Sequence, residues 1–205
     1  MRICKAVAGA VVALALSSVA AWAQSLKVVN VNAPAVNCVF STNCTIVVND
    51  SIGYVPLPYL QAPKTAWLQS RTYTAMAGTP AAGFTGYEYR LSLTEAAGHA
   101  ECLGGLVLNF GTVAKLPYLS GQIAEVFVIT TGGLGTIGVK SAQKSGNVIE
   151  FDFDKPLCLS GGADIANTTY FFGLAAAGAP QAVSAQIFSV GTPPLYAVDA
   201  RVPAH

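Results

Sequence analysis

Charged side chains are scarce in this sequence: Asp, Glu, Lys and Arg make up 10% of its 205 residues, against about 25% in an average soluble domain. The two signs nearly cancel, because 11 basic residues stand against 10 acidic ones. A nucleic-acid-binding domain carries a clustered basic excess, and a membrane-surface segment carries a polybasic run. The charge balance therefore excludes nucleic acid as a partner and excludes a polybasic membrane patch.

Catalytic signatures are also missing. The chain has two histidines, His99 and His205. Without a G-x-S-x-G elbow, a serine-hydrolase triad would depend on His99, where we expect an ordinary loop residue. Neither an H-E-x-x-H zinc motif nor a D-x-[DN]-x-[DN]-G calcium loop is present. We therefore predict no catalytic, cofactor-binding or metal-binding residue, and the sequence favours a protein that is not an enzyme.

The N-terminus has the three parts of an export signal. Arg2 and Lys5 precede an apolar run at residues 6–16, and Ala21-Trp22-Ala23 forms an A-x-A cleavage site. The apolar run is shorter than the roughly 20 residues that cross a bilayer. We predict a signal peptide at 1–23 and a mature chain at 24–205 without a membrane span. The protein is then secreted or periplasmic, and its alanine-rich signal is typical of bacteria.

Four cysteines remain after this cleavage: Cys38, Cys44, Cys102 and Cys158. An even number in an exported chain predicts two disulfides, for which three pairings are possible. Chain order favours Cys38–Cys44, which closes a short loop, and Cys102–Cys158, which joins two distant strands. Zinc is the less favoured alternative, because the cysteines form no C-x2-C pair.

The mature chain is predicted to be one all-β domain. Runs rich in β-branched and aromatic residues occupy 26–31, 45–48, 66–75, 87–93, 103–110, 125–131, 137–142, 148–153, 169–174, 183–190 and 196–202. Short strands at this spacing, with turn residues between them, predict an antiparallel β-sandwich of about 8 to 11 strands. Its core would span about 26–190, and 192–205 would form a last strand or a tail.

A glycine motif after one predicted strand imitates a dinucleotide site. It is a literal G-x-G-x-x-G formed by Gly133, Gly135 and Gly138. A phosphate cradle needs a helix that leads back over a parallel sheet, and only 139–145 is available for it. We therefore predict a glycine turn between two strands, followed by an antiparallel hairpin that turns at 144–147.

Glu150, Asp152 and Asp154 form the one dense acidic cluster. They alternate with apolar residues, so they lie on one face of one strand, about 7 Å apart at each step of two. The pattern favours a solvated face balanced by Lys140 or Lys144. A calcium site and a glycosidase-like carboxyl pair stay open as alternatives.

The segments Tyr87-Glu88-Tyr89-Arg90-Leu91, Val126-Phe127-Val128 with Gly132-Gly133-Leu134-Gly135, and Tyr170-Phe171-Phe172-Gly173-Leu174-Ala175 together resemble a group of bacterial exported β-sandwich proteins without an assigned activity. The likeness covers about residues 69–187 and is a pattern of strands and turns. It implies export and the sandwich fold, and it implies no catalytic, cofactor-binding or ligand-binding residue.

These observations favour an exported, non-enzymatic β-sandwich protein that acts by binding or assembly at the cell surface or outside the cell. Its partner would be an extracellular protein or a glycan. The alternative is a carbohydrate-active enzyme or a carbohydrate-binding module that uses acids such as Glu150, Asp152 and Asp154, or Glu88. Trp67 would contact a glycan if it lay on the surface, although a lone tryptophan in a strand is more often in the core.

Overall fold

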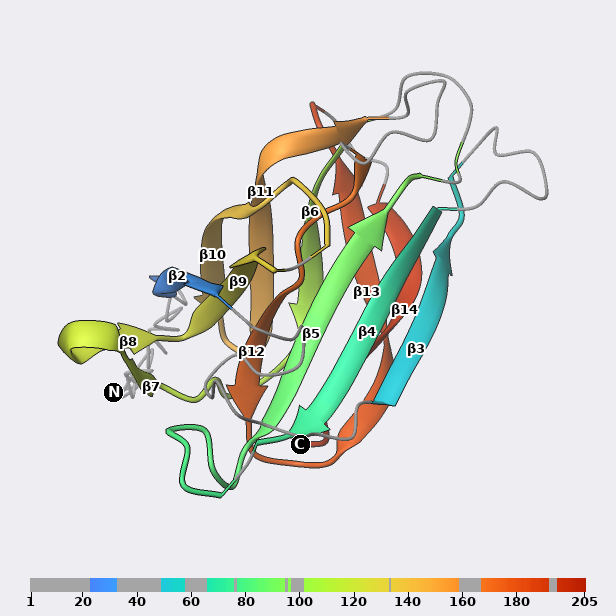
Figure 1. Cartoon of the computed structure of the whole chain (residues 1–205). Helices are drawn as coiled ribbons and strands as arrows, with labels where there is room; N and C mark the ends of the chain where they lie inside the picture. The colour runs from blue at the N-terminus through green and yellow to red at the C-terminus, as the bar shows by residue number, and fades with distance from the viewer. Residues whose placement is uncertain are drawn as a thin grey trace, which may run out of the picture.

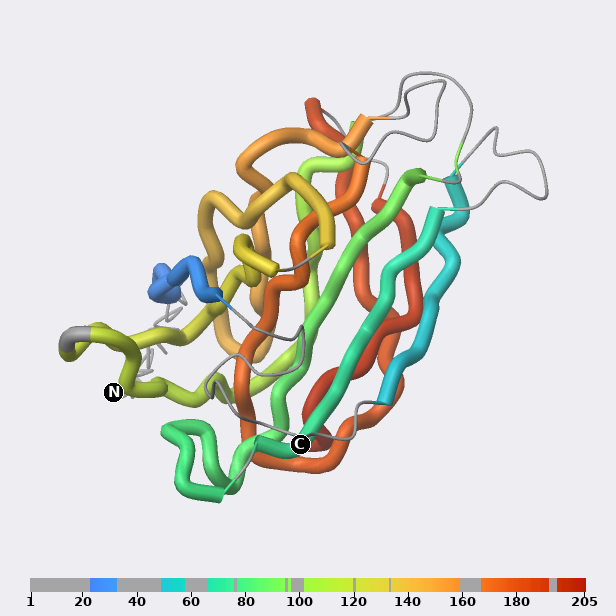
Figure 2. Tube along the Cα trace, in the orientation of Figure 1, coloured from blue at the N-terminus to red at the C-terminus, as the bar shows by residue number. Residues whose placement is uncertain are grey.

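The computed structural model describes residues 23–32, 49–57, 66–75, 77–94, 96, 102–132, 134–158, 167–191 and 195–205 (Figures 1 and 2). Strands and bridges hold 69% of this part of the chain, against about 20–25% in an average globular protein. The same residues contain no α-helix, and a 3-10 turn is present at Leu119–Gly121. The all-β class predicted from the sequence is therefore confirmed.

The strands form two six-stranded sheets and a two-stranded ribbon (Figure 1). The first sheet consists, in spatial order, of β1 (Gln24–Ser25), β10 (Val139–Ser145), β11 (Val148–Cys158), β6 (Cys102–Asn109), β13 (Pro180–Ser189) and β14 (Leu195–Pro203). The second sheet consists of β2 (Val28–Asn32), β9 (Val126–Thr131), β12 (Phe172–Ala176), β5 (Thr85–Ser92), β4 (Ala66–Thr74) and β3 (Asn49–Val55). The ribbon pairs β7 (Leu116–Tyr118) with β8 (Gln122–Ala124).

The two sheets pack face to face around one apolar core. In β5 of the second sheet, Tyr87, Tyr89 and Leu91 all point inward and are fully buried. The rings of Phe151 on β11 and Phe172 on β12 meet across the core, with their centroids 5.1 Å apart. Burial of apolar area stabilises such a core by about 25 cal/mol for each Å² removed from water. The alternating side chains on the opposite side of each strand form the two outer faces.

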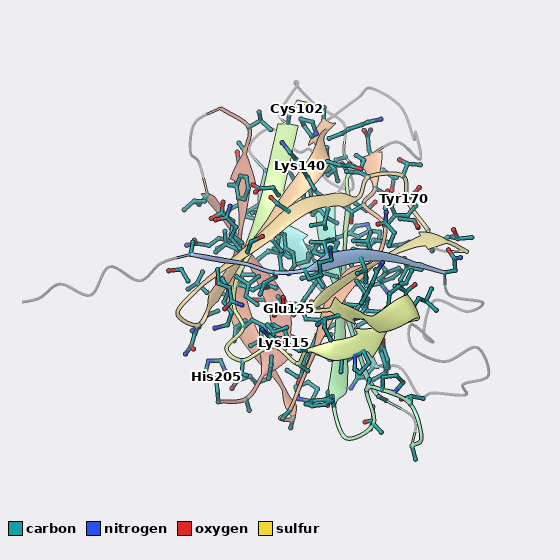
Figure 3. All side chains as sticks on the ribbon, turned by 90° about the vertical axis from the view of Figure 1, so that its left-hand side faces the viewer. Cys102, Lys115, Glu125, Lys140, Tyr170 and His205 are labelled. Carbon is teal, nitrogen blue, oxygen red and sulfur yellow. A yellow bond between two sulfur atoms is a disulfide. The ribbon has the colours of Figure 1, made fainter. Side chains whose placement is uncertain are left out.

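The β7–β8 ribbon packs against part of the outer face of the second sheet. Ala124 and Tyr118 of the ribbon contact a second apolar cluster that includes Val29, Val31, Tyr73, Phe127, Ile129 and Phe171. At the base of the ribbon, Lys115 Nζ lies 3.6 Å from Glu125 Oε1 (Figure 3). The Glu125 carboxylate also accepts a hydrogen bond of 2.9 Å from the backbone N–H of Lys27. These contacts hold β8 beside β2. The outer sides of β3, β4 and β5 adjoin this cluster through Tyr73 and Phe171.

Two details of the predicted sandwich were wrong. The pairing is not antiparallel throughout, because β2 runs parallel to β9, with Val28 opposite Val126. The described residues also contain fourteen strands, more than the 8 to 11 expected. β1, β7 and β8 have two or three residues each, too few for a hydrophobic period to show. β3 begins with Asn49-Asp50-Ser51, whose composition is typical of a turn.

The described chain between β9 in the second sheet and β10 in the first consists of bends and a single bridge at Ile137. Residues 139–145 form strand β10 and not a helix, and β10 turns back into β11 with Ser145 opposite Val148. Gly135 has a φ of +100°, and a Cβ there would lie 2.1 Å from the Thr169 carbonyl oxygen. A glycine is required at this position because its backbone conformation and its close approach both exclude a side chain. Gly133 lies outside the described residues.

Cys102 and Cys158 form the predicted disulfide. They are direct cross-strand neighbours at the ends of β6 and β11, with their Cα atoms 4.0 Å apart. The bond therefore joins residues that are 56 positions apart in sequence. The predicted Cys38–Cys44 bond lies outside the described residues, as does the predicted signal peptide apart from Ala23. Over the described residues, no helix has the length and apolar character to cross a membrane.

Candidate functional site: the outer face of β3, β4 and β5

The outer sides of β3, β4 and β5 present a patterned set of polar and aromatic side chains. Residues in register on neighbouring strands point to the same side of a sheet, so each register row forms one line on the surface. Three rows result, which are Tyr54–Trp67–Ser92, Ile52–Gln69–Arg90 and Asp50–Arg71–Glu88. We use the name arginine–aromatic face for Asp50, Ile52, Tyr54, Trp67, Gln69, Arg71, Arg90 and Phe171.

The edge of this face is aromatic and open to solvent. Tyr54 on β3 is 66% exposed, and Ile52 two residues before it is 53% exposed. Trp67 lies directly opposite Tyr54 on β4 and is half-buried. The side chain of Trp67 therefore belongs to the surface and not to the core between the sheets. Two neighbouring aromatic rings at a sheet edge offer flat apolar contact area together with polar groups at their tips.

Two guanidinium groups and two aromatic rings stack in alternation across the face. Arg90 Cζ lies 4.9 Å from the centroid of Trp67 and 5.1 Å from that of Phe171. Arg71 Cζ lies 4.8 Å from the centroid of Phe171. The order is thus Trp67, Arg90, Phe171, Arg71. Each cation–π contact contributes about 0.5–2 kcal/mol, and the stack fixes where both guanidinium groups lie.

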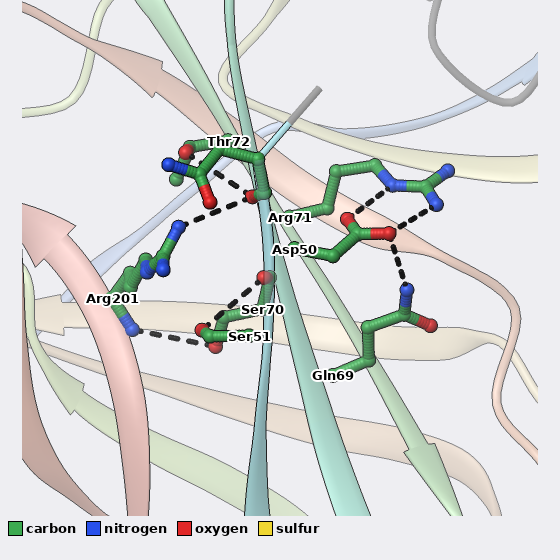
Figure 4. A network of polar contacts seen from close by, with 8 residues as sticks. Asp50, Ser51, Gln69, Ser70, Arg71, Thr72 and Arg201 are labelled. Atoms are coloured by element: carbon green, nitrogen blue, oxygen red, sulfur yellow. Dashed lines mark hydrogen bonds and ion pairs between the residues drawn. The ribbon is translucent and has the colours of Figure 1, made fainter.

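Arg71 is held by a fork of hydrogen bonds to Asp50 (Figure 4). Its Nε donates to Asp50 Oδ1 over 2.7 Å and its Nη2 donates to Oδ2 over 2.8 Å. Gln69 Nε2 donates to the same Oδ2 over 3.0 Å. The hydrogen bonds from Arg71 lower the pKa of Asp50, and the same bonds raise the pKa of Arg71. Asp50 and Arg71 therefore form a compensated ion pair.

Arg90, by contrast, has no hydrogen-bond acceptor and no carboxylate partner among the described residues. Its Nε is buried without a hydrogen bond. Burial lowers the pKa of Arg90, and the charge of Arg71 lowers it further. A guanidinium still stays protonated in a protein. The face therefore holds one positive charge that Asp50 does not neutralise.

Glu88 lies beneath the face and is completely buried. It is directly opposite Arg71 on β4 and Gly173 on β12. Neither of its carboxyl oxygens accepts a hydrogen bond that satisfies normal geometry, and the Tyr73 hydroxyl is likewise unsatisfied. Burial raises the pKa of Glu88 to about 8, although the charge of Arg71 and the Tyr73 hydroxyl act in the opposite direction. At neutral pH the carboxyl group is therefore mostly protonated and uncharged.

Contacts on the inner side of β3 and β4 fix the face to the first sheet (Figure 4). The backbone N–H of Arg201 on β14 donates to Ser70 Oγ over 3.3 Å, and its Nη1 donates to the Asn49 carbonyl over 3.2 Å. β14 also passes so close to β3 that a Cβ on Gly53 would lie 2.3 Å from the Asp199 carbonyl oxygen. The strands that display the site are thus supported from behind by β14.

Glu150, Asp152 and Asp154, which form the acidic cluster of the sequence, lie elsewhere, on strand β11 of the first sheet. Asp152 Oδ2 accepts a hydrogen bond of 2.7 Å from the Ser141 hydroxyl, and Asp154 Oδ1 accepts one of 3.0 Å from the backbone N–H of Gly138. Glu150 is exposed. No three His, Cys, Asp or Glu side chains in the described ranges are placed so that they could hold a metal ion.

Asp152 also lines a depression of about 700 Å³ in the first sheet. Its lining includes Lys140 and Pro156 on one side and Phe188, Val190 and Leu195 on the other. Gly104 on β6 also lines the depression, and the Phe188 ring packs against both Gly104 and Gly105. Asp152 is the single carboxylate in this lining, and Glu150 and Asp154 do not contribute to it. His99 lies outside the described residues.

Sequence patterns do not predict most of the face. Alternation along 66–75 and 87–93 predicts which residues share a side of each strand, but not which side of the sheet is covered. The residues around Asp50 favour a turn, and no motif marks Arg71 or Arg90 as a site residue. A signal is present in the alternation Trp67, Gln69, Arg71, because three polar or amphipathic residues at a spacing of two mark a face exposed to solvent.

Comparisons with family models, with curated proteins and with solved structures give no match to this chain.

Proposed function

We propose that the mature chain is an exported, non-catalytic protein that binds a glycan across the arginine–aromatic face. The observation that carries the proposal is the pairing of Tyr54 with Trp67 at an open sheet edge, next to the side chains of Gln69, Arg71 and Arg90. Sugar rings present apolar C–H faces and hydroxyl edges. Aromatic rings contact the apolar faces, while amide and guanidinium groups bond to the hydroxyl edges.

Preorganisation also supports binding at this face. The stack of Trp67, Arg90, Phe171 and Arg71 and the fork between Arg71 and Asp50 already hold the side chains in place. A ligand then loses less binding free energy to the ordering of flexible side chains, which otherwise costs about 0.5–1.5 kcal/mol for each of them. The open face of a sheet also suits an extended chain of sugars.

The positions of the described carboxyl groups favour glycan binding without cleavage of the glycan. A glycosidase uses two carboxyl groups that flank the scissile bond. In the described structure, Asp152 stands alone in the depression of the first sheet, Glu88 is buried, and Asp50 is engaged by Arg71. The disulfide between Cys102 and Cys158 fits the export part of the proposal, because such bonds persist in oxidising compartments.

Titration of the mature protein with a panel of neutral and acidic oligosaccharides tests the proposal. We expect Tyr54→Ala and Trp67→Leu to weaken binding by roughly tenfold or more, as expected when about 1.4 kcal/mol of aromatic contact is lost. The matched control is Leu195→Ala, which removes an exposed apolar side chain from the depression of the first sheet and should leave the Kd unchanged. Loss of binding in Leu195→Ala alone would move the site to the other sheet and overturn the proposal.

A further inference from the structure

The charges on the arginine–aromatic face do not balance. Asp50 and Arg71 neutralise each other through two hydrogen bonds. Glu88 is uncharged at neutral pH because burial holds its pKa at about 8. Arg90 keeps its charge and has no carboxylate partner in the described part of the chain. The described residues of the face therefore carry one net positive charge at neutral pH.

Two aromatic rings hold the Arg90 guanidinium in place. Its guanidinium lies between the rings of Trp67 and Phe171, at 4.9 and 5.1 Å from their centroids. Because Nε is buried, the N–H groups of Nη1 and Nη2 are the ones that a ligand can reach. Those N–H groups form a planar fork that matches two oxygens of a carboxylate or a sulfate. A half-buried guanidinium without an acceptor is costly unless a ligand supplies one.

We propose that the glycan bound here is acidic, and that an anionic group of the sugar, a carboxylate or a sulfate ester, bonds to the Arg90 guanidinium while a neighbouring sugar ring packs on Tyr54 and Trp67. This inference rests on the glycan-binding function proposed above and adds the class of ligand. The net positive charge favours an anionic ligand over a neutral one, and the adjacent aromatic edge favours a sugar ring over an isolated inorganic anion.

Matched pairs of ligands separate charge from shape. Oligogalacturonates carry free carboxylates, and their methyl esters have the same sugar chain without that charge. Dextran sulfate and dextran form the corresponding pair with and without sulfate groups. We expect the charged member of at least one pair to bind roughly tenfold or more tightly than its neutral partner, because a hydrogen bond to a charged group contributes more free energy than one to a neutral group. Which pair responds identifies the anionic group.

The variant Arg90→Gln removes the charge and keeps part of the side chain. It should abolish the preference for the charged member, so that the two members of each pair bind to Arg90→Gln with similar Kd values. Lys140→Gln, which removes a cation from the first sheet, is the control and should have no effect. If Arg90→Gln keeps the preference, or if both members of each pair bind equally well, the inference is wrong. Glycan binding itself then still stands if Tyr54→Ala weakens it, and fails if Tyr54→Ala changes nothing.

Ionisation of Glu88 gives a second readout. The titratable and charged groups that face it in the described structure are Arg71 and Tyr73 on β4, with Asp50 beyond Arg71, and Arg90 follows two residues later on its own strand. A negative charge on Glu88 would cancel the excess positive charge. Binding of the acidic ligand should therefore weaken as the pH rises through about 8, and Glu88→Gln should remove that dependence. Equal pH profiles for the two proteins would contradict the inference.

Discussion

At Glu88, burial acts strongly against charge. The unfolded chain loses the Glu88 proton near pH 4.5, whereas the folded chain keeps it until about pH 8. Between these values the folded state binds more protons than the unfolded state. The free energy of unfolding must then fall as the pH rises, by up to roughly 1.4 kcal/mol for each pH unit in that window.

Replacement of Glu88 by Gln tests this. We expect the variant to lose the decline in unfolding free energy that the wild type shows between about pH 4.5 and 8. Denaturant titrations at several pH values measure it, and Glu150→Gln, which changes an exposed acid, controls for the loss of one charge. Parallel curves for the wild type and Glu88→Gln would show that Glu88 is already ionised in the folded protein at neutral pH.

Local sequence patterns did not predict the conformation or the exposed side of several site residues. Asp50 follows Asn49 and precedes Ser51, a composition that favours a turn. In the folded chain β3 pairs with β4, and Arg71 opposite Asp50 binds its carboxylate. A contact between residues 21 positions apart decides the local conformation here, and such a contact cannot be predicted from the conformational propensity of neighbouring residues. The position of Trp67 on the outer face is likewise set by which side of β4 meets the first sheet.

At the scale of single elements, the chain between β9 and β10 shows how a glycine fixes a connection. Gly135 combines a φ of +100° with a Cβ position 2.1 Å from the Thr169 carbonyl oxygen. We expect Gly135→Val to lower the free energy of unfolding by well over about 1 kcal/mol, since it adds a collision to an unfavourable backbone conformation.

Gly78→Ala is the matched control for that prediction. Gly78 has a φ of +82°, and no atom lies within 4 Å of the position that a Cβ would take, so its substitution brings backbone strain without a collision. Denaturant unfolding of both variants should show the larger loss for Gly135→Val. Equal losses would mean that the chain near Thr169 moves aside freely.

Binding of NAD, FAD or ATP should not saturate in either protein, since residues 139–145 form a strand.

Long strands were predictable and short ones were not. Residues 87–93 and 148–153 alternate between apolar and polar residues over several periods; the first range matches β5 closely, whereas β11 begins at Val148 and continues to Cys158. β1 contains two residues and takes its strand conformation from pairing with β10. The parallel pairing of β2 with β9 is also a property of chain topology, because the same hydrophobic pattern serves a strand in either direction.

At the scale of the whole molecule, the Cys102–Cys158 bond ties two central strands of the first sheet. Because it links positions 56 residues apart, its loss should increase the entropy of the unfolded chain substantially. We expect the Cys102→Ser/Cys158→Ser variant to unfold with about 2–4 kcal/mol less free energy than the wild type. Repetition under reducing conditions is the control, where the two proteins should converge. A loss near zero in oxidising buffer would show that the fold does not depend on this bond.

The sandwich has two outer faces that differ in character. The first sheet displays Glu150, Asp152 and a depression with apolar walls, and the second displays stacked arginines beside an aromatic edge. From the sequence, candidate site residues could be recognised on the first sheet, because its acids are close together in the chain. The second face is assembled from three strands and from Phe171, which lies just before β12, so its residues are scattered from position 50 to position 171.

The central claim is that the ligand binds to the arginine–aromatic face. Assignment of the backbone amide resonances of residues 24–205, followed by titration with oligogalacturonate or a sulfated oligosaccharide, tests it most directly. The account predicts that saturable shifts concentrate on β3, β4 and β5, with the side-chain resonances of Trp67 and Arg90 among the largest. Shifts that cluster instead around Asp152 and Phe188 on the first sheet, or no shifts with any oligosaccharide, would contradict it.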